Sequence, residues 1–91
     1  MKRVRVFVKG RVQGVFFRAH TRGAALGFHV HGWVRNLPNG QVEALFEGKR
    51  QNVDVLVDWC RHGPPHAVVE ELSVLDEPYT GEFSDFSIRY E

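Results

Sequence analysis

The sequence has few of the features that mark secreted, membrane or nucleic-acid-binding proteins. Its single cysteine, Cys60, cannot form an internal disulfide, which favours a reducing compartment. No apolar stretch approaches the roughly 20 residues of a membrane span, and charges interrupt the first ten residues, MKRVRVFVKG, where a secretory signal is apolar. A net charge of +1, from 12 basic and 11 acidic residues, argues against nucleic-acid binding through bulk electrostatics. We therefore expect a cytoplasmic protein without a membrane or nucleic-acid partner.

The rest of the composition is that of an ordinary globular domain. The chain has 91 residues, 43% of them apolar and 25% charged, which separates it from disordered proteins. No linker rich in proline, serine or glycine, block of like charge or internal repeat divides it. We therefore expect residues 1–91 to form one domain with a single modest core.

Apolar residues recur with the periods of strands and helices along the chain. Alternation predicts strands at residues 3–9, 30–37, 42–48, 68–74 and 86–90. Helical spacing predicts one helix that begins near Phe17 and stops at Gly27, and a second helix with Asn52 as its N-cap. This order, βαββαβ plus a short C-terminal strand, is typical of a ferredoxin-like α/β sandwich. We expect an α+β fold with two helices on one face of a mainly antiparallel sheet. The fold alone does not identify a function, because it hosts many.

The most informative stretch joins the first predicted strand to the first helix. It reads GRVQG, Gly10–Gly14, and Arg18 follows in the first helical turn. A loop that enters a helix N-terminus directs unpaired N–H groups toward one place, where the helix dipole also favours an anion. Glycines let the backbone approach such an anion, and a guanidinium binds phosphate oxygens in a bidentate way. The same residues also fit a tight turn followed by a solvated arginine, and the lysine of a Walker A motif is missing.

Asn36 is the second candidate site residue. In the predicted topology the first and second strands are parallel, so the loop after the first strand and the end of the second share one edge of the sheet. Asn36 lies at that end, two strands or roughly 10 Å away, and has the parity of Val34, on the helix-covered face. Amides, a guanidinium and a neutral amide side chain would then converge on a site of phosphate size. Asn36 also fits a strand-end residue that hydrogen-bonds the turn at Pro38.

Four motifs together resemble the acylphosphatase family over nearly the whole chain. They are GRVQGVFFR (Gly10–Arg18), GWVRN (Gly32–Asn36), the PNG hairpin (Pro38–Gly40) and the terminal FSIRY (Phe86–Tyr90). Phe16 and Leu37 stand where animal forms often have cysteine and threonine, so the resemblance is to the bacterial, free-standing branch. The chain also runs one residue past the usual terminal tyrosine, to Glu91.

The resemblance implies a function and a set of site residues. It implies metal-independent hydrolysis of acyl phosphates, small-molecule substrates, by a monomer without cofactors, with inorganic phosphate or sulfate as product or inhibitor. Arg18 would bind the phosphate and Asn36 would orient the attacking water. The phosphate-binding backbone amides would be those of Arg11, Val12, Gln13, Gly14, Val15 and Phe16.

The histidines and the cysteine are expected to have no catalytic or metal-binding role. The five histidines, among them His29 and His31 on one side of a strand, lack a matching set of cysteines or carboxylates at ligand spacing, so we predict no metal site. Cys60 falls on the apolar stripe of the second helix and is predicted to lie in the core rather than to act as a nucleophile.

Three other functions occur on the same fold. An RNA-binding module of this fold would carry a pair of aromatic residues on its third strand. Here the third predicted strand reads QVEALFEG, which is acidic and lacks that pair, so the sequence argues against RNA binding. A regulatory ligand-binding module would not need the water-orienting role of Asn36. The chain could also correspond to the acylphosphatase-like domain of a larger carbamoyl-phosphate-using maturation protein, although where it begins and ends favours a free-standing enzyme.

Overall fold

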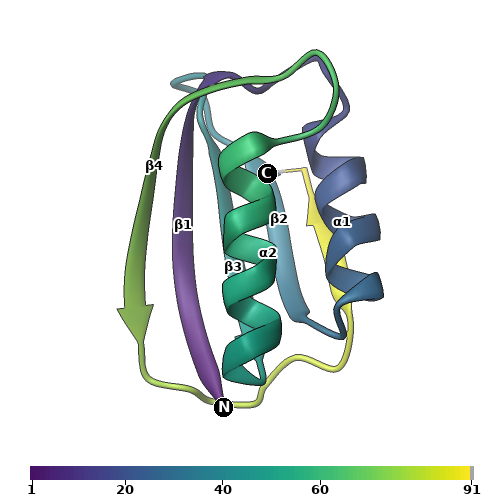
Figure 1. The fold of residues 1–91 in the computed structure, drawn as a ribbon, viewed down its shortest axis with the longest axis vertical. Coiled ribbons are helices and arrows are strands. Elements are labelled where there is room, and N and C mark those ends of the chain that lie inside the picture. Colours follow the sequence, from purple (N-terminus) through teal and green to yellow (C-terminus); the bar gives the residue numbers. More distant parts are fainter. Residues whose placement is uncertain (91) are drawn as a thin grey trace.

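The computed structural model describes residues 1–90 and contains two helices on one five-stranded sheet (Figure 1). The elements in chain order are β1 (Lys2–Arg11), α1 (Phe17–Gly27), β2 (His31–Asn36), β3 (Val42–Gly48), α2 (Arg50–His62), β4 (Val68–Glu77) and β5 (Phe86–Arg89). The strand order is β4-β1-β3-β2-β5; β2 and β5 are parallel, and the other neighbouring pairs are antiparallel. Both helices cover the same face of the sheet (Figure 1). The ferredoxin-like α+β architecture is therefore confirmed, and neither described helix is long and apolar enough to cross a membrane.

The core lies between the helices and the sheet face that they cover. Val4, Val6 and Val8 of β1 are essentially fully buried on this face, as the alternation predicted. The buried residues of α2 are Val53, Leu56, Val57 and Cys60, the helical stripe read from the sequence. Strands β1 and β2 both run antiparallel to β3, so they are parallel to each other. Their C-terminal ends therefore lie at the same edge of the sheet.

The first strand is longer than the sequence predicted. Gly10 and Arg11 do not begin the loop but continue β1, where they pair with Val69 and Val68 of β4 after a bulge at Glu70 of β4, opposite Lys9 and Gly10. At Gly10 the φ angle is +135°, and a Cβ atom would lie 2.1 Å from the carbonyl oxygen of Val68, so only glycine fits this bulge. The bulge also changes the parity of β4, so that Val69 packs on the core while Val68 is exposed.

The predicted N-cap of the second helix is wrong. Helix α2 begins at Arg50, its N-cap is Lys49, and Asn52 lies in the first turn. Because β3 ends at Gly48, the extended backbone of Lys49 already directs its carbonyl group to the amides of Asn52 and Val53, at 3.0 Å each. The helix therefore starts directly after the strand without a side-chain cap.

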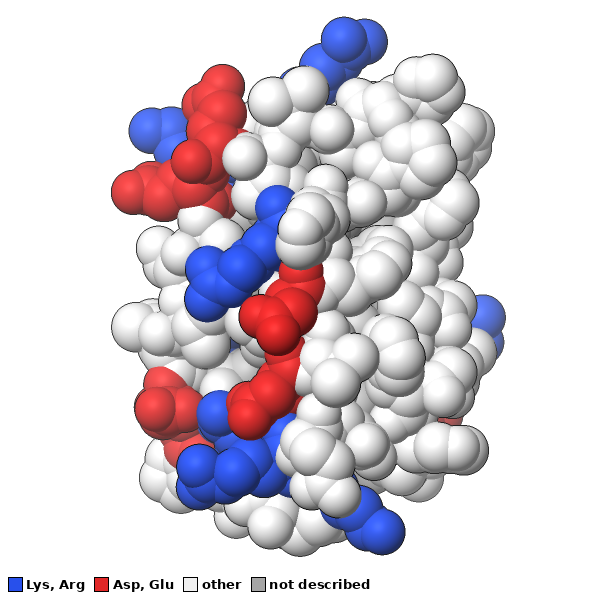
Figure 2. Space-filling model, in the orientation of Figure 1, with Lys and Arg blue, Asp and Glu red and all other residues white. Residues whose placement is uncertain are grey.

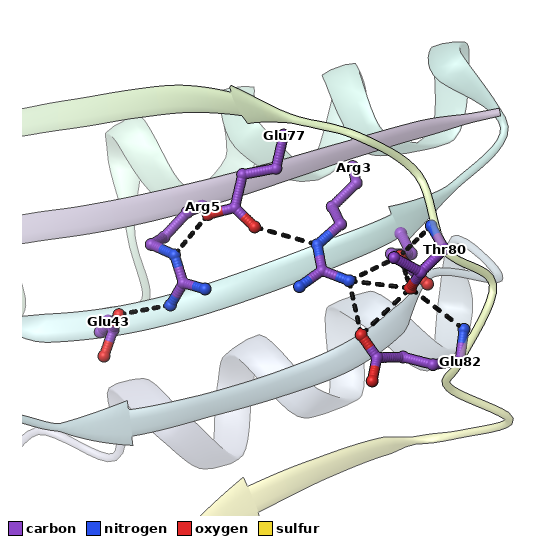
Figure 3. A network of polar contacts seen from close by, with 7 residues as sticks. Arg3, Arg5, Glu43, Glu77, Thr80 and Glu82 are labelled. Carbon is purple, nitrogen blue, oxygen red and sulfur yellow. Dashed lines mark hydrogen bonds and ion pairs between the residues drawn. The ribbon is translucent and has the colours of Figure 1, made fainter.

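The sheet face opposite the helices carries a network of arginines and glutamates (Figure 3). Arg5 contacts Glu77 at 2.6 Å and Glu43 at 2.7 Å, and Arg3 contacts Glu77 at 3.0 Å. Hydrogen bonds from Arg5, and then from Arg3, lower the pKa of Glu77 below its ordinary value. Trp33 lies under guanidinium groups of this face and is only 5% exposed. The face is thus filled by ion pairs and not by an open apolar surface.

We predict that Glu77→Gln destabilises the protein at neutral pH and that the loss shrinks in acid. A carboxylate whose pKa is lowered on folding contributes stability above its unfolded pKa of about 4.3, and that contribution is lost as the pH falls through the lower folded value. Urea unfolding of parent and variant at several pH values measures the difference. Glu70→Gln, an exposed position on the same strand, is the matched control. A difference in unfolding free energy that stays constant down to pH 2 would exclude the ionised pair as the cause.

Candidate functional site

The loop between β1 and α1 has a backbone suited to binding an anion. Gly14 and Phe16 adopt left-handed conformations, with φ of +75° and +60°. Left-handed geometry is uncommon and unfavourable for a residue with a side chain such as Phe16, and residues held in this way cluster at functional sites. Within residues 1–90, no hydrogen bond to a protein acceptor is donated by the backbone N–H groups of Gln13–Phe16. Successive free amides in such a turn form an anion-binding concavity.

Helix α1 adds partial positive charge at the same place. It begins at Phe17, directly after the loop, and has neither a side-chain cap nor an acidic residue in its first turn. Its dipole therefore points its positive end at the loop amides. On the face shown in Figure 2, acidic side chains gather over α2 and β4 and are nearly absent over α1.

Arg18 lies in the first turn of α1, as predicted. Its guanidinium carbon is 5.0 Å from the centroid of the Tyr90 ring. In the described part of the chain Arg18 forms no ion pair with a carboxylate. The aromatic ring orients the guanidinium, and its hydrogen-bond donors remain available for an anionic ligand.

Asn36 is the last residue of β2 and pairs with Val42 of β3. It has the parity of Val34, on the helix-covered face, as predicted. Its Oδ1 is buried and accepts no hydrogen bond from any described residue. The turn that follows is held instead by Leu37, Asn39 and Gln41, without the Asn36 side chain. An acceptor of this kind is costly to bury unless it has a further role, such as binding water or a ligand.

The Gln13 side chain connects the loop to the strand end that carries Asn36. Its Nε2 donates to the carbonyl groups of Leu37 and Gln41, both at 2.8 Å. The sequence predicts a role only for the backbone amide of Gln13, because the partners of its side chain lie 24 and 28 residues further along the chain. The one available signal was a long polar side chain between two loop glycines. The two bonds fix the loop relative to Asn36.

The other predicted amide donors occupy different environments. Arg11 ends β1 and has an exposed side chain, whereas the side chain of Val12 is buried in the core. Val15 packs partly against the core, and Phe16 is 77% exposed. The side chains of Val12 and Val15 thus anchor the loop to the core, while its backbone stays at the surface.

The remaining reactive side chains lie outside this region. Cys60 is buried in the core, and burial raises the pKa of its thiol to about 12, so it stays protonated. This confirms its predicted place in the core. No group of three or more histidine, cysteine, aspartate or glutamate side chains within residues 1–90 is arranged to hold a metal ion.

Comparison with known proteins assigns this arrangement to a family. The family model described as acylphosphatase matches residues 4–88, which include the β1–α1 loop, Arg18 and Asn36. The chain belongs to the acylphosphatase family. An acylphosphatase from Syntrophus aciditrophicus (strain SB) is 70% identical over 91 residues, which cover 100% of this chain and 95% of that protein. An acylphosphatase from Aeropyrum pernix is 55% identical over 89 residues, or 97% of this chain and 88% of that one.

Solved acylphosphatase structures have the same fold. The crystal structure of acylphosphatase from Bacillus subtilis matches with a TM-score of 0.95 at 36% identity, covering 99% of this chain and 100% of that chain. The predicted resemblance to acylphosphatases is therefore confirmed along the whole sheet and both helices.

Proposed function

We propose that this chain hydrolyses the carboxyl–phosphate bond of acyl phosphates to a carboxylate and inorganic phosphate, without a metal ion. In this proposal the backbone amides of residues 11–16 and the Arg18 guanidinium bind the phosphate, and Asn36 orients the attacking water. Membership of the acylphosphatase family supports the reaction. The proposal includes a single domain over residues 1–91 that acts as a monomer, since every proposed group lies on the same chain.

The observation that carries the residue roles is the placement of three kinds of group at one edge of the sheet. The free loop amides and the first turn of α1 supply donors and positive charge for phosphate oxygens. The buried Oδ1 of Asn36 supplies an acceptor without a protein partner. Gln13 fixes the two halves of the site relative to each other. Donors for an anion and an acceptor for water are what hydrolysis at phosphorus requires.

These groups suffice because the reaction is undemanding. A carboxylate is a good leaving group, and phosphoryl transfer to water passes through a loose transition state in which positioning and charge stabilisation do most of the catalysis. The loop amides and Arg18 neutralise the equatorial oxygens, while Asn36 accepts a hydrogen bond from the water and holds it in line. The substrate phosphate can take the proton, so no strong general base is required.

The experiment that tests this function is a hydrolysis assay in excess EDTA. We expect phosphate release from acetyl and benzoyl phosphate and almost none from a simple phosphomonoester, because an alkoxide is a far poorer leaving group than a carboxylate. We also expect inorganic phosphate to inhibit as a product. Activity that disappears with the chelator and returns with a divalent metal would overturn the mechanism.

A further inference from the structure

We infer that the acyl part of the substrate lies in a hollow beside the β1–α1 loop, where Arg11, His20 and His66 favour acyl groups that carry a second carboxylate. The inference rests on the proposed function and adds a substrate class to it. The hollow has a volume of about 360 Å³, which lies in the range of small-molecule sites. Gly14, Val15 and Phe16 form one wall, so the hollow adjoins the amides proposed to bind the phosphate.

Part of the lining of the hollow is apolar. Phe16 is 77% exposed and has a left-handed backbone, two features that are both unfavourable for a phenylalanine in a free protein. Val15 and Pro65, the latter in the α2–β4 connection, also line the hollow. An acyl chain that covers the Phe16 ring would remove apolar surface from water.

Another part of the lining is basic. Arg11, His20 and His66 all line the hollow, and none of its lining residues is acidic. Arg11 forms no ion pair within residues 1–90. A guanidinium fork matches a carboxylate, and an imidazole N–H can donate a further hydrogen bond. These lining residues are therefore suited to an anion, although the phosphate is proposed to bind elsewhere, at the amides and Arg18.

The position of His66 is unusual in the same way as that of Phe16. It is a non-glycine residue with φ of +72°, in the turn where the amide of Ala67 donates to the carbonyl group of Pro64. Phe16 and His66, two strained residues 50 positions apart in the sequence, thus line the same hollow. Strain retained at two points of a cavity lining is typical of a ligand site.

Two matched substrates test the inference: adipoyl monophosphate and hexanoyl phosphate. Both have six carbons, and they differ at the far end, where one carries a carboxylate and the other a methyl group. The quantity measured is the ratio of kcat/KM for adipoyl over hexanoyl phosphate, after subtraction of spontaneous hydrolysis. The parent should give a ratio above one. The double variant His20→Gln, His66→Asn should lower that ratio about tenfold, the loss expected for a hydrogen bond to a charged group.

The variants are chosen to preserve the fold. His20 is exposed on α1, and asparagine tolerates the left-handed backbone of His66. The single variants are measured as well, and thermal melts check folding. His31→Gln, an exposed histidine on β2 outside the hollow, is the control and should leave the ratio unchanged.

The outcomes separate the two proposals. A ratio near one in the parent, or the same ratio in the parent and the folded double variant, would overturn the inference while leaving acyl phosphate hydrolysis intact. If the parent hydrolyses neither compound, the proposed function fails, and the inference fails with it.

Discussion

Arg18→Ala will lose both phosphate binding and turnover. The substitution removes a charge-assisted, bidentate contact, and we expect the dissociation constant of inorganic phosphate to rise at least about tenfold. Turnover of acetyl phosphate should fall by about 10²–10³-fold, as for other charge-stabilising donors. Arg18→Lys should not restore it, because an ammonium is a point charge without the guanidinium fork. Calorimetric titration with phosphate and initial rates in EDTA measure the two effects.

Arg22→Ala on the same helix is the matched control for Arg18. The Nε of Arg22 donates a hydrogen bond to the carbonyl oxygen of Phe86, so this side chain is directed to β5 and not to the loop amides. We expect its loss to lower stability slightly and to leave phosphate affinity unchanged. Near-normal turnover in Arg18→Lys would show that bidentate binding is the wrong description of Arg18.

Asn36→Ala is expected to separate binding from catalysis. If Asn36 only orients the water, the variant should bind inorganic phosphate almost as tightly as the parent. Its kcat should nevertheless fall by about 10²-fold or more, because misplacing a nucleophile by about 1 Å has an effect of that size. Asn36→Asp should also weaken phosphate binding, since it places a negative charge beside an incoming anion.

Asn39→Ala provides the control for a purely structural effect at this hairpin. Its Oδ1 accepts a hydrogen bond from the amide of Gln41 at 3.0 Å, so its removal should lower the melting temperature without a selective loss of kcat. A folded Asn36→Ala protein with parental phosphate affinity and full turnover would end the water-orienting role.

The architecture could be predicted because burial repeats with the period of each element. Val4, Val6 and Val8 alternate with charged or half-buried residues, and this period of two marked both the strand and its core face. Chain order then placed β1 and β2 parallel with β3 between them, which brought Arg18 and Asn36 to the same edge of the sheet. Their positions follow from local patterns and from topology.

The features that could not be predicted depend on pairing between distant segments. Strand β4 runs alongside Gly10 and Arg11 after a register shift between Lys9 and Gly10, and this pairing extends β1 into residues that looked like a loop. The two hydrogen bonds of Gln13 reach the far side of a hairpin. No local pattern shows either contact, because each joins segments that are far apart in the sequence.

The Asn52 error has a different origin. Asparagine is in general favoured at N-caps. Here β3 ends at Gly48 and leaves no loop before α2, so the carbonyl group of Lys49 accepts the first hydrogen bonds of the helix. The position of the preceding strand outweighed the local preference.

Hydrolysis of acetyl phosphate in ¹⁸O-labelled water with excess EDTA tests the central claim most directly. If a water held by Asn36 attacks phosphorus, each turnover places one labelled oxygen in inorganic phosphate and none in acetate, and mass spectrometry of the two products distinguishes them. Label in the acetate carboxylate would show attack at the carbonyl carbon. That result would contradict the account of Arg18 and Asn36 given above.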